Sequence, residues 1–578
     1  MEERTVNGKR IGGICASEKP LRGTIRATPP AENNLLGTMM DYPLLLGSML
    51  ERAGKLFPHA EVASRQPDHS VHRCTYRDIR ERSQRLACGL QLAGLQPGDR
   101  VGSLMWNHYA HLECYFGVPM AGGVLHTLNL RLHPEELAYI INHGGDRFLI
   151  VDDVLVPVFE AVRQQVNLER VFVVSHYPKE SREGYEHYDD LLSAPPEPDT
   201  VITDEHAAVA MCYTSGTTGR PRGIVYSHRA LALHTFAAAL PDAFCLSHRN
   251  VFMPLQPMFH ANAWGFPFMA TMLGAKQVLP GPYLDAESLL ELITQEQVTM
   301  SGGVPTVWAG VLDALEAEPQ RWKITPGFRM MIGGAAPPES LIRGLDRHGL
   351  RVIHAWGMTE TSPVTLVNNL KSNLDGLTDE QKIALRCKQG ISLPYTEARI
   401  ADEQGCELPA DGKSAGELQV RGPWVASDYY QQSEGSHAWT DDGWFKTGDV
   451  AAMDPEGYVK LVDRAKDLIK SGGEWISSVD IENALMTHAA VKEAAVIGVA
   501  DSKWGERPLA VVVLRPGSQA TSEELAGYLR ERFAKWQIPD SCVFLPALPH
   551  TSTGKVSKAQ LRLRFKALNW ERAAAAGN

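Results

Sequence analysis

Short apolar runs alternate with segments of helical periodicity along most of the chain. The runs "VGSLMW" from Val101, "DRFLIVDD" from Asp146 and "RVFVVS" from Arg170 are typical of buried strands, as are "AAVAMCY", "KQVLPG", "FRMMIGG" and "LRVIHAW". Between two such regions, apolar residues follow the spacing of one helix face at Tyr76, Ile79, Leu86, Leu90 and Ala93. Thr75, with Asp78 three residues later, predicts the start of that helix. This alternation indicates an α/β fold with largely parallel sheets.

The pattern changes after about Glu397. Short strands joined by Gly, Pro and Asp turns follow, and "DPEG" from Asp454 predicts a hairpin turn. After Asp463 the chain reads as a compact unit with helices, such as "SSVDIENALMTH", and strands, such as "AAVIGVA" and "LAVVVLRP".

Composition narrows the class of protein. The chain has 578 residues, 44% of them hydrophobic and 22% charged, which is ordinary for a globular protein. Its net charge of -11 argues against a nucleic-acid partner. Nine cysteines, with no C-x-x-C pair and no Cys/His cluster of metal-ligand spacing, favour a reduced, cytoplasmic location.

Residues 250–275 contain no charged side chain and are long enough to cross a membrane. Pro254, Pro257 and Pro267 interrupt the segment, so we expect a buried strand, a loop and a helix near a pocket, and no integral membrane segment. Residues 1–34 lack sustained periodicity and a signal-peptide core. We interpret them as a disordered extension or an over-long start; a targeting presequence fits less well because Glu2 and Glu3 open it.

A polar loop stands out within "YTSGTTGRPRGIVYSH", which runs from Tyr213 to His228. It lies between the apolar "AAVAMC" and the helical "RALALHTFAAAL", so we expect a loop between a buried strand and a helix. Glycines there allow close approach of an anion, and backbone amides and hydroxyls can donate to it. The predicted phosphate-binding residues are Thr214, Ser215, Gly216, Thr217, Thr218 and Gly219. A flexible linker is the alternative, and the loop is not a Walker A sequence.

This loop resembles the phosphate-loop signature of adenylate-forming enzymes, a superfamily that includes acyl-CoA synthetases, peptide-synthetase adenylation domains and luciferases. Further segments match in the family's order: "GGAAPP" from Gly333, "HAWGMTE" from His354, "TGD" from Thr447, "DRAKDLIKSGGEWIS" from Asp463 and "TSTGK" ending at Lys555. The chain is most similar to medium-chain fatty-acyl-CoA ligases and 3-methylmercaptopropionyl-CoA ligases through "MMDYPLLLGSMLERA", "HTLNLRLHPEELAYIINH", "PMFHANAWG" and "SGGVPTVW".

The resemblance implies a fold and a reaction. The fold would have a large domain over 35–462, built of α/β subdomains and a small β-barrel-like subdomain, a hinge over 463–467, and a small mobile α+β domain over 468–578. The reaction would join a carboxylic acid to ATP, giving acyl-AMP and pyrophosphate. CoA would then displace AMP to give an acyl-CoA, most plausibly of a medium-chain fatty acid. Oligomeric state is not encoded in these patterns, and a homodimer is compatible with them.

The resemblance also assigns nucleotide contacts. Glu360 matches the family's Mg²⁺ ligand, Thr359 a phosphate contact, and Asp449 the acid that accepts both ribose hydroxyls. Trp356 resembles the aromatic residue on the adenine face, and Arg464 a ribose or phosphate contact. The two loops that flank the nucleotide would contribute Gly334, Ala335, Ala336, His354, Ala355, Gly357 and Met358.

Catalysis and the second step are assigned in the same way. Lys555 matches the lysine between the carboxylate and the phosphate, with Thr214, His260 and Glu360 as further catalytic residues. Lys466 falls at the family's hinge, where rotation of the small domain would bring "KSGGEW" to the nucleotide and CoA. The residues of that segment assigned to this role are Lys470, Gly472, Gly473, Glu474 and Trp475.

The acyl site would be lined by His260, Trp264, Gly303, Val304, Pro305 and Trp308. One departure is Arg222, because many members have Pro-Lys-Gly where this chain has Pro-Arg-Gly, and the role of this side chain is open. The alternatives to a medium-chain ligase are a ligase for 3-methylmercaptopropionate or another short or aryl acid, an enzyme that loads a carrier protein, and a non-catalytic relative. The presence of Glu360, Asp449 and Lys555 argues against the last of these.

Overall fold

A computed structural model describes residues 37–177, 183–196, 202–214, 220–431, 438–464, 466–471, 474–501, 503–551 and 555–566. The predicted extension over 1–34 lies outside these residues, as do Ser215 to Gly219 of the polar loop and Gly472 and Gly473.

Two mostly parallel sheets form the first part of the chain. The first has the order β7 (Glu186–His187), β6 (Arg170–Val174), β5 (Asp146–Asp152), β3 (Arg100–Leu104), β4 (Val124–Thr127), β8 (Ala208–Tyr213), β9 (Gly223–Ser227). The second has the order β16 (Ile391–Ser392), β15 (Val364–Val367), β14 (Arg351–Gly357), β13 (Arg329–Ile332), β12 (Met300–Gly303), β10 (Val251–Pro254), β11 (Lys276–Leu279), β1 (Glu61–Arg65), β2 (Val71–Thr75). The strands predicted from apolar runs are confirmed, with antiparallel pairs at the edges.

Helices cover both sheets. They are α1 (Leu46–Leu56), α2 (Tyr76–Leu92), α3 (Tyr109–Met120), α4 (Pro134–Gly144), α5 (Val156–Glu160), α6 (Tyr188–Leu191), α7 (His228–Ala239), α8 (Phe266–Leu273), α9 (Ala286–Glu296), α10 (Pro305–Ala317), α11 (Glu339–Arg347) and α12 (Asp379–Arg386). The predicted start of α2 is confirmed, because Thr75 and Asp78 form a capping box. The uncharged segment 250–275 folds as β10, a turn (Ala261–Gly265) with left-handed backbone angles, and α8.

Two smaller sheets complete the described chain. Strands β17 (Glu397–Ala401), β18 (Ala415–Arg421), β19 (Phe445–Met453) and β20 (Val459–Arg464) pair antiparallel in linear order, and the predicted "DPEG" turn joins the last two. The last sheet contains β21 (Ile469–Ser471), β22 (Glu474–Ile476), β23 (Val491–Asp501), β24 (Gly505–Leu514) and β25 (Ser541–Phe544), with helices α13 (Ser478–Met486), α14 (Ser522–Arg530) and α15 (Lys558–Phe565). The predicted α/β class, with a small C-terminal α+β unit, is confirmed.

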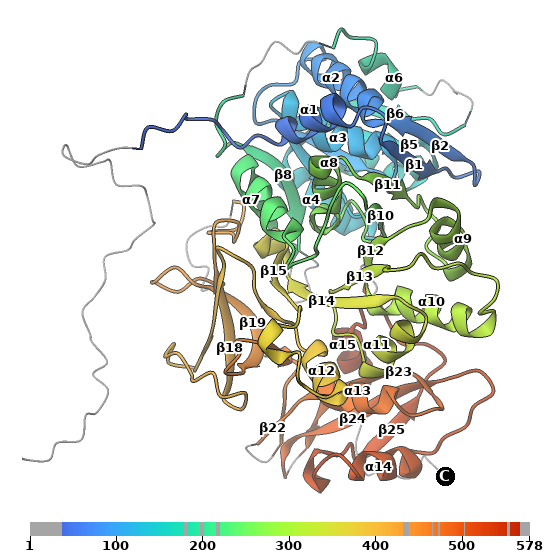
Figure 1. Ribbon diagram of the computed structural model, residues 1–578, viewed down its shortest axis with the longest axis vertical. Coiled ribbons are helices and arrows are strands. Elements are labelled where there is room, and N and C mark those ends of the chain that lie inside the picture. Colours follow the sequence, from blue (N-terminus) through green and yellow to red (C-terminus); the bar gives the residue numbers. More distant parts are fainter. Residues whose placement is uncertain are drawn as a thin grey trace, which may run out of the picture.

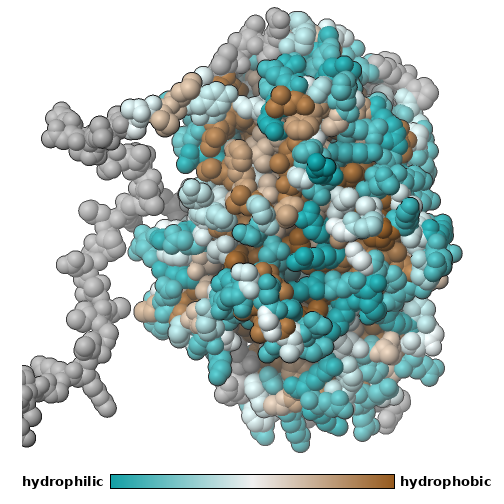
Figure 2. Space-filling model, viewed as in Figure 1, coloured by the Kyte–Doolittle hydropathy of each residue, from teal (hydrophilic) through white to brown (hydrophobic). Residues whose placement is uncertain are grey.

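In Figure 1 the C-terminal unit, in orange and red, lies below the strands β13 and β14, and the sheet of β17–β20 lies to their left. Figure 2 shows apolar surface gathered on the upper half of this face, around α1, α7 and α8, whereas the lower part is mostly hydrophilic. Within the described residues, no helix is long and apolar enough to cross a membrane.

Candidate functional site

A cavity of about 1530 Å³ lies where the larger sheets, the sheet of β17–β20 and the C-terminal unit meet. Its wall contains most of the residues that the sequence singles out. They are Thr214, His260, Trp264, Val304, Pro305, Gly334, Ala335, Ala336, His354, Ala355, Trp356, Gly357, Met358, Thr359, Glu360, Asp449, Arg464, Lys466 and Lys555. Residues separated by more than 300 positions therefore share one space.

The described ends of the polar loop, Thr214 and the residues from Arg220 to Arg222, line this cavity and join the two strands of a hairpin. We expected a loop between a strand and a helix, which is wrong, because β8 and β9 pair antiparallel on either side of it and α7 begins only after β9. The base of the loop is closed by two hydrogen bonds: the Thr214 amide donates to the Arg222 carbonyl (2.9 Å), and the Arg222 amide donates to Thr214 Oγ1 (3.1 Å). No helix N-terminus directly follows the loop, so binding of an anion there would rely on the amides and hydroxyls of the loop itself.

The acid predicted to hold ribose lies between two partners. Asp449 is buried on β19; its Oδ2 accepts a hydrogen bond from Trp356 Nε1 (2.9 Å), and its Oδ1 pairs with Arg464 Nε (2.6 Å). Asp449 and Arg464 are direct neighbours across β19 and β20. Burial raises the pKa of Asp449 above its ordinary value, against the opposing effects of Arg464 and Trp356. Each partner uses one acceptor position, so the carboxylate keeps capacity for two more hydrogen bonds.

Glu360 lies in a 3₁₀ turn (Thr359–Thr361) directly after β14 and is buried. Its Oε1 accepts a hydrogen bond from the Tyr429 hydroxyl (2.7 Å), and its carbonyl accepts one from the Ala426 amide (2.7 Å). Among the described residues, Oε2 has no hydrogen-bond partner. The carboxylate is thus held at one oxygen and available at the other.

Lys555 comes from the C-terminal unit and reaches the loop after β13. A Cβ atom placed on Gly334 would lie 3.4 Å from Cε of Lys555. Burial and the nearby Arg464 guanidinium lower the pKa of Lys555 to about 8, although Asp449 and Glu360 act in the opposite direction. No ion pair of its ammonium occurs within the described part of the chain. The ammonium therefore lies near the carboxylates of Asp449 and Glu360 without forming an ion pair with either.

Four residues predicted for the acyl site line the cavity: His260, Trp264, Val304 and Pro305. The ring of Trp264 lies against the loop after β13, within 3.4 Å of a Cβ placed on Gly333, and Val304 and Pro305 line the cavity beside it. Burial and the Lys555 ammonium lower the pKa of His260 to about 4, so this side chain is a neutral imidazole at physiological pH. Gly303 and Trp308, which the sequence also predicts for this wall, do not line the cavity. Trp308 is a fully buried residue of α10, and its Nε1 lies 3.1 Å from the Cβ position of Gly303.

The segment predicted to reach CoA lies elsewhere in the C-terminal unit. Lys470 is on β21 and does not line the cavity; its amide donates to Glu506 Oε2 (3.1 Å). Glu474 and Trp475 form part of β22, which pairs with β21. In this orientation of the C-terminal unit, Lys555 lines the cavity, whereas Lys470 on β21 does not.

Two family models match this chain. The family model "AMP-binding enzyme" matches residues 50–430, and "AMP-binding enzyme C-terminal domain" matches 480–555. The chain belongs to the AMP-binding enzyme family.

Its curated relatives are CoA ligases. A "Long-chain-fatty-acid--CoA ligase" of Thermus thermophilus is 50% identical over 92% of this chain and 98% of its own. A "Medium-chain-fatty-acid--CoA ligase" of Ectopseudomonas oleovorans is 41% identical over 92% and 98%, and a "3-methylmercaptopropionyl-CoA ligase" of Ruegeria lacuscaerulensis is 43% identical over 92% and 99%. The predicted resemblance is confirmed, and the protein is an acyl-CoA ligase.

Solved structures of this family share the fold. An anthranilate CoA ligase in complex with anthranoyl-AMP superposes with a TM-score of 0.81 at 25% identity, covering 93% of this chain and 99% of the other. ATP-bound MatB from Rhodopseudomonas palustris gives a TM-score of 0.75 at 26% identity, covering 90% and 99%.

Tyr429, which no sequence motif predicts, connects two motifs of the ligase's cavity. Tyr429 lines the cavity, donates to Glu360, and lies under Arg222, whose guanidinium carbon is 3.9 Å from the ring centroid. A tyrosine in "ASDYYQQ" carries no motif signal, and only the fold brings it to both partners.

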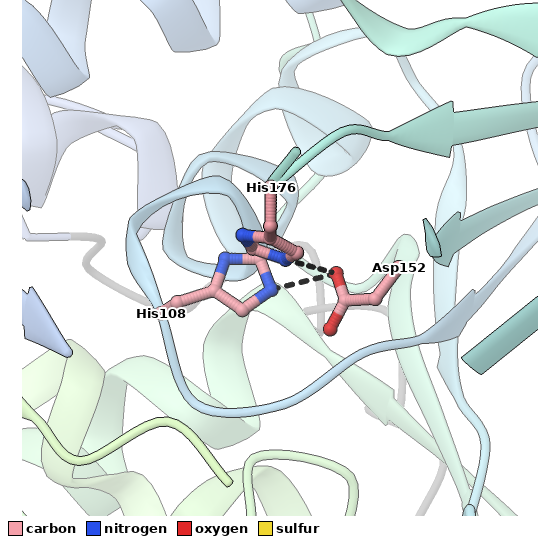
Figure 3. A group of neighbouring side chains, drawn as sticks. All are labelled: His108, Asp152 and His176. Atoms are coloured by element: carbon pink, nitrogen blue, oxygen red, sulfur yellow. Dashed lines mark hydrogen bonds and ion pairs between the residues drawn. The ribbon is translucent and has the colours of Figure 1, made fainter. Parts of the chain in front are cut away.

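A second buried polar group of the ligase lies at the carboxyl ends of β3, β5 and β6, away from the cavity. Figure 3 shows His108 and His176 pointing at the same oxygen of Asp152. His108 Nε2 lies 2.8 Å and His176 Nε2 3.3 Å from Asp152 Oδ1, and the Trp106 amide donates to Oδ2 (2.9 Å). Two imidazoles and a carboxylate are also a familiar set of metal ligands.

Hydrogen bonding assigns protons to this group. The Ala110 amide donates to His108 Nδ1 (3.2 Å), so the His108 proton is on Nε2. His176 Nδ1 lies 2.9 Å from Gln66 Oε1 and donates to it, because the Gln66 amide nitrogen donates to the Ser64 carbonyl. Although burial opposes it, Asp152 raises the pKa of His176 and so favours its imidazolium form. These contacts and the direction of the pKa shift favour an ion pair between Asp152 and the imidazoles that face it.

Proposed function

We propose that this ligase activates a fatty acid, with medium-chain acids as the preferred substrates. In the first step the carboxylate attacks the α-phosphate of ATP, giving acyl-AMP and pyrophosphate. In the second step the CoA thiolate attacks the acyl carbonyl, giving acyl-CoA and AMP. The observation that carries the proposal is the position of Lys555, which reaches from the C-terminal unit to the Gly334 loop, near both Glu360 and Asp449.

The first step joins two anions, so its rate depends on positioning and on cationic and hydrogen-bonding groups. The Lys555 ammonium would lie between the substrate carboxylate and the α-phosphate and stabilise the charge that builds between them. Neutral His260 would donate a hydrogen bond to the carboxylate without competing with Lys555 as a cation. Thr214 and Thr359 would contact phosphate oxygens from the loop and from the 3₁₀ turn.

The remaining nucleotide would be held by its ribose and base. Asp449 retains acceptor capacity for the two ribose hydroxyls, beside its bonds to Trp356 and Arg464. The loop from Gly334 to Ala336 and the strand end at Trp356 would flank the adenine. Glu360 fits a hard divalent cation because its carboxylate is buried, oriented by Tyr429 and has an oxygen without a protein partner in the described residues. Bound there, Mg²⁺ would neutralise phosphate charge during the first step.

The second step requires the other side of the C-terminal unit. We propose a large domain over 35–462, a hinge over 463–467 and a small domain over 468–578. Lys466 lines the cavity between Arg464, which pairs with Asp449, and Asp467, which pairs with Arg562 of α15. Rotation about Lys466 would withdraw Lys555 and bring Lys470 and its neighbours to the cavity to receive CoA.

Support for a fatty acid comes from the apolar wall of Trp264, Val304 and Pro305 and from the names of the relatives. One methylene changes binding in an apolar pocket by only ~1–3 kcal/mol, so chain length must be measured. The test is a screen of 3-methylmercaptopropionate and of fatty acids from propionate to palmitate with ATP, Mg²⁺ and CoA, following pyrophosphate release and the thioester by mass. We expect the maximum at octanoate or a near neighbour. A maximum at palmitate, or at 3-methylmercaptopropionate, would replace the medium-chain assignment, and acyl-AMP without thioester would point to a carrier-loading enzyme.

A further inference from the structure

Tyr429 connects the polar loop with the Glu360 turn. Its hydroxyl donates to Glu360 Oε1 (2.7 Å), and its ring lies under the guanidinium of Arg222, at 3.9 Å from centroid to Cζ. The backbone of Arg222 is fixed at the base of the loop by two hydrogen bonds with Thr214, one to its amide and one to its hydroxyl oxygen. The three side chains form a continuous path from the loop to the carboxylate.

The backbone around Tyr429 is tied at both ends. The Ala426 amide donates to the Glu360 carbonyl (2.7 Å), and the Tyr430 amide donates to the Gly223 carbonyl (2.8 Å). Trp439 packs edge-on against the Tyr429 ring, with centroids 5.2 Å apart. Tyr429 is only 5% exposed. The ring therefore has little freedom to move relative to either Glu360 or Arg222.

A hydroxyl bond to one carboxylate oxygen limits rotation of the Glu360 side chain and determines where Oε2 lies. A tyrosine hydroxyl is protonated at neutral pH and therefore acts as a donor to this carboxylate. Arg222 contributes in a way that lysine would not, because only a planar guanidinium stacks flat on a ring.

We propose that Tyr429 is a positioning residue for the divalent cation of the first step, holding Glu360 by its hydroxyl, and that Arg222 holds Tyr429 by stacking. The proposal rests on the cation role of Glu360 in the proposed function. It also gives a role to the arginine at position 222, where lysine is common in the family.

The test measures cation binding and catalysis separately. Mn²⁺ binding in the presence of a non-hydrolysable ATP analogue is followed by electron paramagnetic resonance, with no acid present. The Mg²⁺ dependence of ATP–pyrophosphate exchange is measured with octanoate on the same preparations. We expect Tyr429→Phe, which keeps the ring, to weaken Mn²⁺ binding and raise the Mg²⁺ requirement about tenfold, as expected for a lost hydrogen bond to a charged group.

Two further variants complete the design. Tyr430→Phe removes a hydroxyl one residue away, whose partner is Gln431, and should leave Mn²⁺ binding unchanged. Arg222→Lys keeps the charge but not the stacking, and should weaken Mn²⁺ binding about two- to fivefold. Thioester formation from supplied acyl-AMP should be unaffected in Tyr429→Phe, because that step does not use the cation.

The outcomes are distinct. Unchanged Mn²⁺ binding in folded Tyr429→Phe, or an equal loss in Tyr430→Phe, would overturn the proposal. If Tyr429→Phe does not fold, the Arg222→Lys variant tests the proposal instead. Mn²⁺ binding as tight in Arg222→Lys as in the wild-type protein would overturn the stacking role. The wild-type protein could fail to exchange pyrophosphate with any of the acids, while Tyr429→Phe still weakens Mn²⁺ binding. In that case the proposed function fails and the positioning role stands.

Discussion

Two clusters of buried charged side chains in this ligase contain similar residue types, but they differ in how many of their polar atoms have partners within the protein. At the carboxyl edge of the β3–β5–β6 strands, both oxygens of Asp152 are occupied by His108, His176 and the Trp106 amide. In the cavity, Glu360 has an oxygen without a protein partner and the Lys555 ammonium has no ion pair, within the described residues. A polar group satisfied by the protein itself stabilises the fold, whereas one left open has bonding capacity for a ligand.

This contrast predicts a division of effects. Variants in the cavity should change chemistry and leave stability intact, because the groups removed there make few protein contacts. Variants around Asp152 should change stability and leave chemistry intact.

Lys555→Ala should lower the rate of acyl-AMP formation at least ~10²-fold, by analogy with other lost groups that stabilise charge in the transition state. Thioester formation from supplied acyl-AMP should be spared, and the melting temperature should not fall, because the ammonium is buried without an ion pair. Pyrophosphate exchange, thioester release and calorimetry on one preparation check this. Equal losses in both half-reactions would contradict the assignment of Lys555 to the first step.

Lys466→Pro should keep acyl-AMP formation but slow its transfer to CoA by roughly tenfold or more. Proline fixes φ near −65° and removes a backbone amide, so it should retain one orientation of the C-terminal unit without touching a reacting atom. The two half-reactions are measured separately on folded protein. If both rates survive or both fall together, position 466 is not the pivot.

The pH dependence of kcat/KM for pyrophosphate exchange should show a falling limb near pH 8. The pKa of Lys555 is lowered to about 8, so its positive charge is present below that pH and lost above it, about tenfold per pH unit at the limit. Lys555→Arg should move the limb to higher pH, even at a lower overall rate. A limb that stays near pH 8 in that variant would belong to another group.

His176→Leu should cost about 1–3 kcal/mol of stability near pH 6, since it removes a buried hydrogen-bonding and charge partner of Asp152. The pKa of His176 is raised on folding, so its contribution is complete below the unfolded value of about 6.5 and disappears as pH rises through the folded value. The difference between wild type and variant should therefore shrink toward pH 9. Melting temperatures across this range check it, with unchanged pyrophosphate exchange as the control.

Local patterns predicted much of the fold. Apolar runs gave the strands, and Thr75 with Asp78 gave a helix start, because both depend on neighbours within a few residues. The placement of the polar loop failed because "GIVYS" is too short to be told from the start of the following helix by periodicity. Pairing of β9 with β8 is a long-range contact that the segment alone does not encode.

Within the candidate site, motif residues were found singly and their mutual contacts were not. Asp449 and Arg464 face each other across β19 and β20, but a register shift between Val450 and Ala451 prevents counting from the "DPEG" turn. Tyr429 reaches Glu360 across a separation of 69 residues, and no spacing rule predicts such a bond. Trp308 is close to Val304 and Pro305 in sequence, but on α10 it is buried in the core and does not line the cavity with them.

Lys555 follows every other predicted site residue along the chain, and this order matters while the protein is being made. Synthesis delivers the loop, the Glu360 turn and the Asp449 strand before the segment that holds Lys555. A chain at that stage has its nucleotide-binding residues but, on the proposed mechanism, no means of converting ATP. Activity would begin only when the last unit folds against Gly334, so a partly made or C-terminally clipped chain would hold nucleotide without releasing pyrophosphate.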